Sequence, residues 1–124
     1  MGWEIMPGAL YGIVARIRKE YTKLPIYITE NGAAFNDRIS GDKKVHDNER
    51  IEYLKEHLKK VAELNEKGMD IRGYFIWSLM DNFEWQHGYS KRFGIVYIDY
   101  ETQERILKDS ALWYKEFIKK RVIK

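Results

Sequence analysis

Two segments of the sequence combine residue types that could carry chemistry, and the first centres on Glu30. This residue directly follows the apolar run 25–29 and precedes an Asn-Gly turn pair. Functional side chains collect at the carboxyl ends of strands in parallel α/β sheets. Strand alternation places Glu30 on the same face as Ile26 and Ile28. A carboxylate at that position indicates either a functional role or a surface ion pair, and position alone does not choose between them.

The second segment is 77–85, Trp-Ser-Leu-Met-Asp-Asn-Phe-Glu-Trp, which follows another apolar run. Its aromatic residues alternate with carboxylates and an amide; these polar residues are Asp81, Asn82 and Glu84. Sugars stack their C–H faces on aromatic rings while their hydroxyls form hydrogen bonds with such polar groups. A single tryptophan is more often part of a core. Three aromatic residues in so polar a loop favour a sugar-binding surface.

The sequence gives little support to other chemistries. His46, His57 and His87 are too scattered for a ligand set, so we expect no metal or cofactor, and we expect His57 on a solvated helical face. The 22 Lys+Arg and 19 Asp+Glu residues are interleaved, which is typical of solvated surface and predicts no nucleic-acid partner. No apolar run reaches the roughly 20 residues that cross a bilayer, so we expect no membrane role.

The composition is that of a folded protein. The 124 residues are 44% hydrophobic and 15% aromatic, which excludes disorder for most of the chain. The sequence contains no cysteine, so disulfides and thiolate chemistry are excluded. This fits a reducing compartment or a hot environment. We therefore expect a cytoplasmic and thermostable protein.

Hydrophobic periodicity indicates the elements that must position these residues. Apolar side chains at helical spacing alternate along the chain with short, continuous apolar runs. We expect the apolar runs to be strands covered on both faces by helices. The predicted elements are helices at 7–21 and 47–68, strands at 25–29, 71–79 and 93–99, and a last helix capped by Asp109.

The alternation of strands and helices predicts an α/β fold with parallel strands. Two buried strands cannot form a sheet of their own, because each edge would leave unpaired backbone groups. The length is also too short for an eight-fold barrel of about 250 residues. We find no linker or repeat, so residues 1–124 are expected to form a single segment of a larger domain.

Together these segments resemble the carboxyl-terminal part of glycoside hydrolase family 1. Residues 25–32, Pro-Ile-Tyr-Ile-Thr-Glu-Asn-Gly, resemble the family's nucleophile motif. Residues 73–85, Gly-Tyr-Phe-Ile-Trp-Ser-Leu-Met-Asp-Asn-Phe-Glu-Trp, resemble its glycone-binding motif, and 88–97 continue the match. The resemblance covers residues 1–119. It implies the last two βα units of a (β/α)8 TIM barrel, together with the helix that precedes them.

The resemblance implies roles for individual residues. Glu30 matches the catalytic nucleophile at the end of the seventh barrel strand. Trp77 matches the platform under the glycone and precedes a peptide bond, Trp77–Ser78, that is expected to be cis. Glu84 matches the carboxylate that grips the outer sugar hydroxyls, and Trp85 matches the indole that donates to a neighbouring hydroxyl.

Further matches bear on specificity. Phe93 matches an aromatic residue that closes the glycone pocket, and Trp3 lies where the family commonly lines the aglycone side. The Glu-Trp pair at 84 and 85 is similar to the branch that acts on plain glucosides and galactosides. The phospho-glycosidase branch has phosphate-binding residues there. Gln86-His87, between Trp85 and Gly88, is a less usual pair in the family, so the sequence does not determine which sugar and which linkage are recognised.

One expected component is absent from the sequence. A retaining glycosidase needs two carboxyl groups about 5–5.5 Å apart. The family's acid/base motif, Asn-Glu-Pro, does not occur, and Asn65-Glu66 is followed by Lys67 within a predicted helix. We therefore expect a retaining β-glycosidase that hydrolyses β-glucosides or related β-glycosides only with the amino-terminal remainder of the barrel, supplied as another chain or a missing segment. The alternatives are a non-catalytic carbohydrate-binding module and an inactive barrel fragment.

Overall fold

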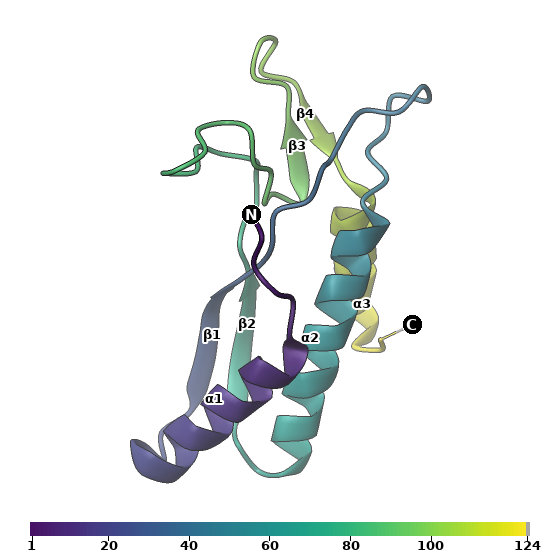
Figure 1. Cartoon of the computed structure of the whole chain (residues 1–124). Coiled ribbons are helices and arrows are strands. Elements are labelled where there is room, and N and C mark those ends of the chain that lie inside the picture. Colours follow the sequence, from purple (N-terminus) through teal and green to yellow (C-terminus); the bar gives the residue numbers. More distant parts are fainter. Residues whose placement is uncertain (124) are drawn as a thin grey trace.

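In the computed structural model, which describes residues 1–123, helices lie to one side of a pair of parallel strands (Figure 1). A small antiparallel hairpin lies beyond the carboxyl ends of those strands. The elements in chain order are α1 (Pro7–Glu20), β1 (Ile26–Asn31), α2 (Asn48–Glu66), β2 (Ile71–Ile76), β3 (Val96–Ile98), β4 (Arg105–Leu107) and α3 (Asp109–Lys120).

The helices and parallel strands confirm the predicted α/β order. Pro7 opens α1, where its missing N–H costs nothing. The core between the helices and the sheet is formed by Val14 of α1, Leu64 of α2 and Ile71 of β2. Full burial of such a side chain stabilises the fold by about 1.5–3 kcal/mol. Ile26 and Ile28 of β1 pack against this core, so that face of the sheet looks toward the helices.

The opposite face of the sheet has no cover among residues 1–123. Tyr27 of β1 and Phe75 of β2 are 55% and 57% exposed. The prediction of strands covered on both faces is therefore wrong for the described part of the chain. The helices α1 and α2 supply the core residues that cover one face, and the large side chains on the other face are exposed. Among residues 1–123, each parallel strand also has a single hydrogen-bonded neighbour, because β1 pairs with β2 alone.

The last third of the chain differs from the prediction in two places. Residues 93–99 form a strand only at Val96–Ile98, and this strand pairs with the unpredicted strand β4. Asp109 does not cap α3 but is its first residue, and the N-cap position is taken by Lys108. The Asp109 carboxylate instead lies 2.6 Å from Nδ1 of His46, and this contact raises the pKa of that imidazole.

Buried charges join the loops above the sheet. Arg50 of α2 donates from Nη2 to Asp37 at 2.8 Å and from Nη1 to Asp47 at 2.8 Å. Lys108 donates to Asp81 at 2.9 Å and also to Asp37. Burial raises the pKa of Asp37 and lowers the pKa of Lys108, and the opposite charges around each group offset this effect. Such a network is favourable only when every member has its partner.

The open sheet predicts that the chain associates. Other chains can pair with the open strand edges and can pack on the apolar surface of Tyr27 and Phe75. We expect size-exclusion chromatography with light scattering to show species larger than a 14.9 kDa monomer. The variant Tyr27→Lys should shift the distribution toward smaller species. A monodisperse, cooperatively unfolding monomer would contradict this prediction.

The buried charges predict a large stability difference between two lysines. Lys108→Met leaves Asp37 and Asp81 short of a buried cation, so we expect a loss of about 3–5 kcal/mol in the free energy of unfolding. Lys59→Met is the matched control, because Lys59 pairs with Glu56 on the exposed surface of α2 and should leave the midpoint nearly unchanged. Urea unfolding followed by near-ultraviolet circular dichroism at one protein concentration measures both. Equal midpoints for the two variants would show that the network contributes little.

Candidate active site

A β-bulge near the end of β1 decides where Glu30 lies. Ile28 pairs with Tyr74 and Asn31 pairs with Ile76, so two residues of β1 lie opposite Phe75 alone. The extra residue resets the alternation of side chains. Ile28 and Asn31 both face the helices, where the Asn31 side chain accepts a hydrogen bond from Tyr74.

Glu30 is exposed, and as the neighbour of Asn31 in an extended strand it projects from the face opposite the helices. The prediction that Glu30 shares the face of Ile26 and Ile28 is wrong, because strand parity does not survive the bulge. The carboxylate nevertheless lies at the carboxyl end of a parallel strand, as predicted. It lies on the uncovered side of the sheet.

The end of β1 contacts the segment that follows β2. The Trp77 N–H donates to the Asn31 carbonyl at 3.0 Å. A Cβ atom added at Gly32 would lie 1.7 Å from the Trp77 carbonyl oxygen, so only glycine fits there. The Trp77–Ser78 peptide bond is cis, which confirms the expectation. The structure thus brings the backbones of the Glu30 and Trp77 segments together, with the Trp77 side chain 38% exposed.

The segment 93–96 runs beside the chain that leaves β2. Ser78 N–H donates to the Phe93 carbonyl at 3.1 Å, and Ile95 N–H donates to the Ser78 carbonyl at 3.0 Å. Gly94 lies so close to Met80 and Asp81 that an added Cβ atom would come within 2.4 Å of both backbones. The Phe93 side chain is buried. These contacts fix Trp77 and Phe93 relative to each other.

The loop that follows β2 contains a tight hairpin. Glu84 and Gly88 exchange backbone hydrogen bonds of 2.8 and 2.7 Å, and Gly88 has a positive φ of 57°. Glu84 is partly buried, whereas Trp85 at the tip is 91% exposed. Trp3 is 75% exposed. Residues 1–123 therefore do not pack Trp85 or Trp3 into an enclosed site.

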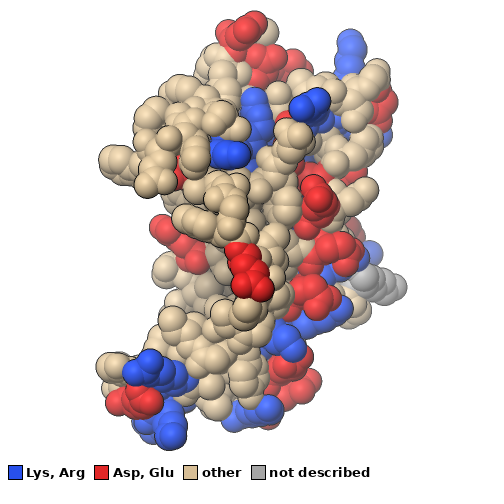
Figure 2. Space-filling model, viewed as in Figure 1, with Lys and Arg blue, Asp and Glu red and all other residues tan. Residues whose placement is uncertain are grey.

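Two residues that the sequence grouped with the sugar ligands hold the loop instead. Asp81 is buried, and it accepts hydrogen bonds from Arg92 at 2.6 Å and from the Gly94 N–H at 3.0 Å, in addition to its Lys108 contact. Asn82 donates to Ser78 Oγ at 3.0 Å and to the Met80 carbonyl at 2.9 Å. With these groups engaged, Glu84 is the carboxylate of the segment left for a ligand. In Figure 2 the surface of this loop consists mostly of uncharged side chains, whereas charged side chains gather along α2, at the far end of α1 and at the top of the molecule.

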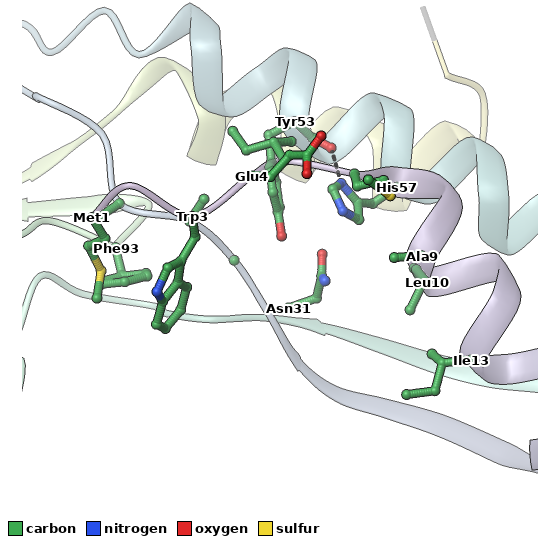
Figure 3. A pocket seen from close by; sticks show the side chains of 15 residues that line it. Met1, Trp3, Glu4, Ala9, Leu10, Ile13, Asn31, Tyr53, His57 and Phe93 are labelled. Carbon is green, nitrogen blue, oxygen red and sulfur yellow. Dashed lines mark hydrogen bonds between the residues drawn. The ribbon is translucent and has the colours of Figure 1, made fainter.

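A cavity of about 370 Å³ opens between the N-terminal segment, α1, α2 and the end of β1 (Figure 3). Its lining includes Trp3, Phe93, Asn31, Tyr53 and His57. The prediction that His57 lies on a solvated face is wrong. His57 is buried against the Tyr53 ring, Nδ1 donates to the Tyr53 carbonyl at 2.7 Å, and burial lowers the pKa of the imidazole.

The sequence analysis did not identify the tyrosines beside Asn31, one of which, Tyr53, is drawn in Figure 3. The Tyr53 hydroxyl points toward the Asn31 side chain, which accepts a hydrogen bond from Tyr74 Oη at 2.6 Å. Burial raises the pKa of Tyr53, and a hydrogen bond from Asn31 offsets part of that rise. Both tyrosines occur within apolar periodic runs and resemble core residues, so no sequence signal identified them.

No group of three or more acidic, histidine or cysteine side chains within residues 1–123 is arranged to hold a metal ion. None of the helices in that part of the chain combines the length and apolar character that a membrane crossing needs.

The parallel βα arrangement places a carboxylate and aromatic residues at the carboxyl ends of adjacent strands, where α/β enzymes carry their functional side chains. Residues 1–123 match the family model of glycosyl hydrolase family 1. The chain therefore belongs to this family. A structure of the family 1 β-glucosidase from Thermotoga maritima superimposes with a TM-score of 0.94 and is 55% identical over 96% of this chain. The chain thus adopts part of the TIM-barrel fold of these enzymes.

Curated relatives differ in the activities that their names give. Beta-glucosidase A of Thermotoga maritima is 55% identical over 96% of this chain. A bifunctional beta-D-glucosidase/beta-D-fucosidase of Bifidobacterium breve is 55% identical over 95%, and a 6-phospho-beta-galactosidase of Staphylococcus aureus is 48% identical over 98%. The chain spans 27% of the Thermotoga protein and 26% of each of the other two.

The contact at Gly32 makes a testable prediction. Gly32→Ala forces the ends of β1 and β2 apart, because the new methyl group overlaps a backbone carbonyl that cannot rotate away. We expect a loss of at least about 1–3 kcal/mol in the free energy of unfolding, as for other overpacked sites. Gly41→Ala is the control, because nothing lies within 4 Å of its added methyl group. Urea unfolding measures both, and a neutral Gly32→Ala would show that the strand ends are not in close contact.

Proposed function

We propose that this chain is the nucleophile-bearing and glycone-binding part of a retaining β-glycosidase that hydrolyses β-glucosides or related β-glycosides. One observation carries the proposal. Glu30 is on the uncovered face of the sheet at the end of β1, and the partly exposed Trp77 follows the neighbouring strand β2. Family membership supports it, since relatives over nearly the whole chain are named β-glucosidases.

In the proposed reaction Glu30 acts as a carboxylate. It attacks the anomeric carbon and forms a covalent glycosyl-enzyme, while the aglycone oxygen leaves with a proton from a second carboxylic acid. That second group then removes a proton from water, which attacks the anomeric carbon and releases Glu30. The sequence has no Asn-Glu-Pro motif to supply the acid. The acid/base Glu is therefore assigned to the remainder of the barrel.

We assign the binding roles to residues whose side chains do not hold the loop together. Trp77 provides the platform under the glycone, and Glu84 and Trp85 take its hydroxyls. Phe93 closes the glycone pocket and Trp3 lines the aglycone side. The Glu84-Trp85 pair favours plain glycosides over phosphorylated ones, although one relative is named a 6-phospho-beta-galactosidase.

The partner of this chain is the amino-terminal remainder of the barrel, as another chain or as further sequence of the same protein. The chain contributes two βα units and the preceding helix, which we assign as the last two units of the barrel. Two observations support a missing remainder: relatives are about four times as long, and both parallel strands have an open edge. We propose that the chain alone is inactive.

Mechanism-based labelling tests the proposal. The chain is mixed with, or fused to, the remaining portion of the Thermotoga maritima β-glucosidase, and the complex is incubated with a 2-deoxy-2-fluoro glucoside that carries a good leaving group. We expect the fluorosugar to accumulate on Glu30, identified by peptide mass mapping, because the nucleophile bonds to the anomeric carbon. Glu30→Gly should lose turnover by several orders of magnitude while retaining binding of a sugar-shaped inhibitor.

The outcomes separate the alternatives. A label on another carboxylate, or near-normal turnover of Glu30→Gly without added nucleophile, would overturn the assignment of Glu30. Sugar binding by a completed barrel in which wild type and variant are equally inactive would favour a carbohydrate-binding module. A chain that neither binds the remainder nor binds sugar would be an inactive barrel fragment.

A further inference from the structure

We infer that Asn31, held by Tyr74 and Tyr53 on the helix side of the sheet, is the device that aims Glu30, so that these three are positioning residues for the nucleophile. This inference rests on the proposed function of Glu30 and assigns a role to residues on the side of the sheet away from the substrate. The bulge in β1 sets the direction of Glu30. Regular alternation would turn Glu30 toward the helices with Ile26 and Ile28, and the structure has it on the other face.

A bulge near a strand end needs contacts that hold it, because the extra residue is left out of the ladder. Asn31 is the residue where pairing resumes, opposite Ile76. Its backbone carbonyl accepts from Trp77 N–H at 3.0 Å, and its side-chain oxygen accepts from Tyr74 Oη at 2.6 Å. Asn31 is thus tied to the neighbouring strand through both its main chain and its side chain.

The Asn31 amide lies beside two tyrosine hydroxyls. Its Oδ1 accepts from the Tyr74 hydroxyl at 2.6 Å, and the Tyr53 hydroxyl points toward the same side chain (Figure 3). Tyr53 lies on α2 and Tyr74 on β2. Asn31 therefore connects the first strand to both the crossover helix and the second strand.

The two tyrosines are themselves fixed. Tyr53 is buried between Phe35, whose ring centroid is 6.2 Å away, and His57, at 4.0 Å. Tyr74 lies within β2, where it pairs with Ile28 of β1. Burial raises the pKa of Tyr74 far above its usual range, so its hydroxyl stays protonated and remains a donor. An amide held by rigid, neutral donors and acceptors keeps one orientation.

The consequence for Glu30 is mechanical. If the Asn31 side chain loses its hold, the strand end can slip back to regular alternation, which carries the Glu30 carboxylate away from the substrate side. A displacement of about 1 Å at a reacting group costs up to about a hundredfold in rate. Residues that contact the sugar would be little affected. Loss of a tyrosine hydroxyl leaves the backbone bond between Asn31 and Trp77 in place, and Glu84 is held by its backbone pairing with Gly88.

The test uses the completed enzyme and two buried hydroxyls. Tyr74→Phe removes the donor to Asn31, and we expect kcat to fall about ten- to hundredfold with KM changed less than about twofold. Tyr114→Phe is the matched control, because it also removes one hydroxyl bonded to β2 but does not touch Asn31. It should keep wild-type kcat. Tyr53→Phe, which removes the other partner of Asn31, serves as a second variant if Tyr74→Phe does not fold.

A bypass of the nucleophile separates positioning from general damage. In the Glu30→Gly background, azide can attack the anomeric carbon of a 2,4-dinitrophenyl glucoside in place of Glu30, expelling dinitrophenolate and forming a glucosyl azide. If Tyr74 acts through Glu30, adding Tyr74→Phe to Glu30→Gly leaves the azide-dependent rate unchanged. A structural defect would lower that rate as much as it lowers kcat of the wild type.

Each outcome is decisive. A low kcat for Tyr74→Phe with an unchanged azide-dependent rate in the double variant supports the inference. Equal kcat for Tyr74→Phe, Tyr53→Phe and wild type, or a parallel loss in the azide-dependent rate, overturns it. Labelling of wild type on a carboxylate other than Glu30 overturns the proposed function instead, so the two failures are distinguishable.

Discussion

Five charged side chains with almost no access to water hold together the segments that carry the site. Asp37 lies in the loop after β1, Asp47 and Arg50 at the start of α2, Asp81 in the loop after β2, and Lys108 next to α3. The pattern matters because Asp37, Asp81 and Lys108 lie in connections between elements, and hydrophobic packing alone does not define the path of a connection. Breaking one member would leave a buried charge without its partner, which is costly. The network thus anchors the loop between Trp77 and Glu84 at Asp81.

This network also explains why two similar carboxylates, Asp81 and Glu84, have different surroundings. Asp81 and Glu84 are three positions apart in a loop with the composition of a sugar site, and the same sequence argument applied to both. Asp81 is drawn inward because two cations and a backbone N–H meet there. Glu84 lies on a hairpin whose backbone groups satisfy each other, so its carboxylate remains available. Asp81 and Glu84 therefore differ in which cations the fold brings to them.

The candidate site lies on a sheet that is open in the described residues. The face that carries Glu30 is also the face that exposes Tyr27 and Phe75, and both parallel strands have an open edge. In the proposed complete barrel those features become the lining of the barrel and its closed hydrogen-bond ladder. Under the proposed function, Glu30 is one of the two carboxylates that a retaining mechanism requires, and it lies on the face where the other would meet it.

The sequence by itself determined the α/β order, the parallel pairing, the strand-end position of Glu30, and the family, because periodicity and long motifs are local properties of the chain. It did not determine the face from which Glu30 projects, because one extra residue in β1 reverses the alternation and only the pairing with β2 reveals it. It likewise placed His57 in solvent and Asp81 among the sugar ligands. Tertiary structure decided both, since the burial of His57 against Tyr53 and the convergence of Arg92 and Lys108 on Asp81 join residues distant in sequence, and no local pattern encodes such contacts.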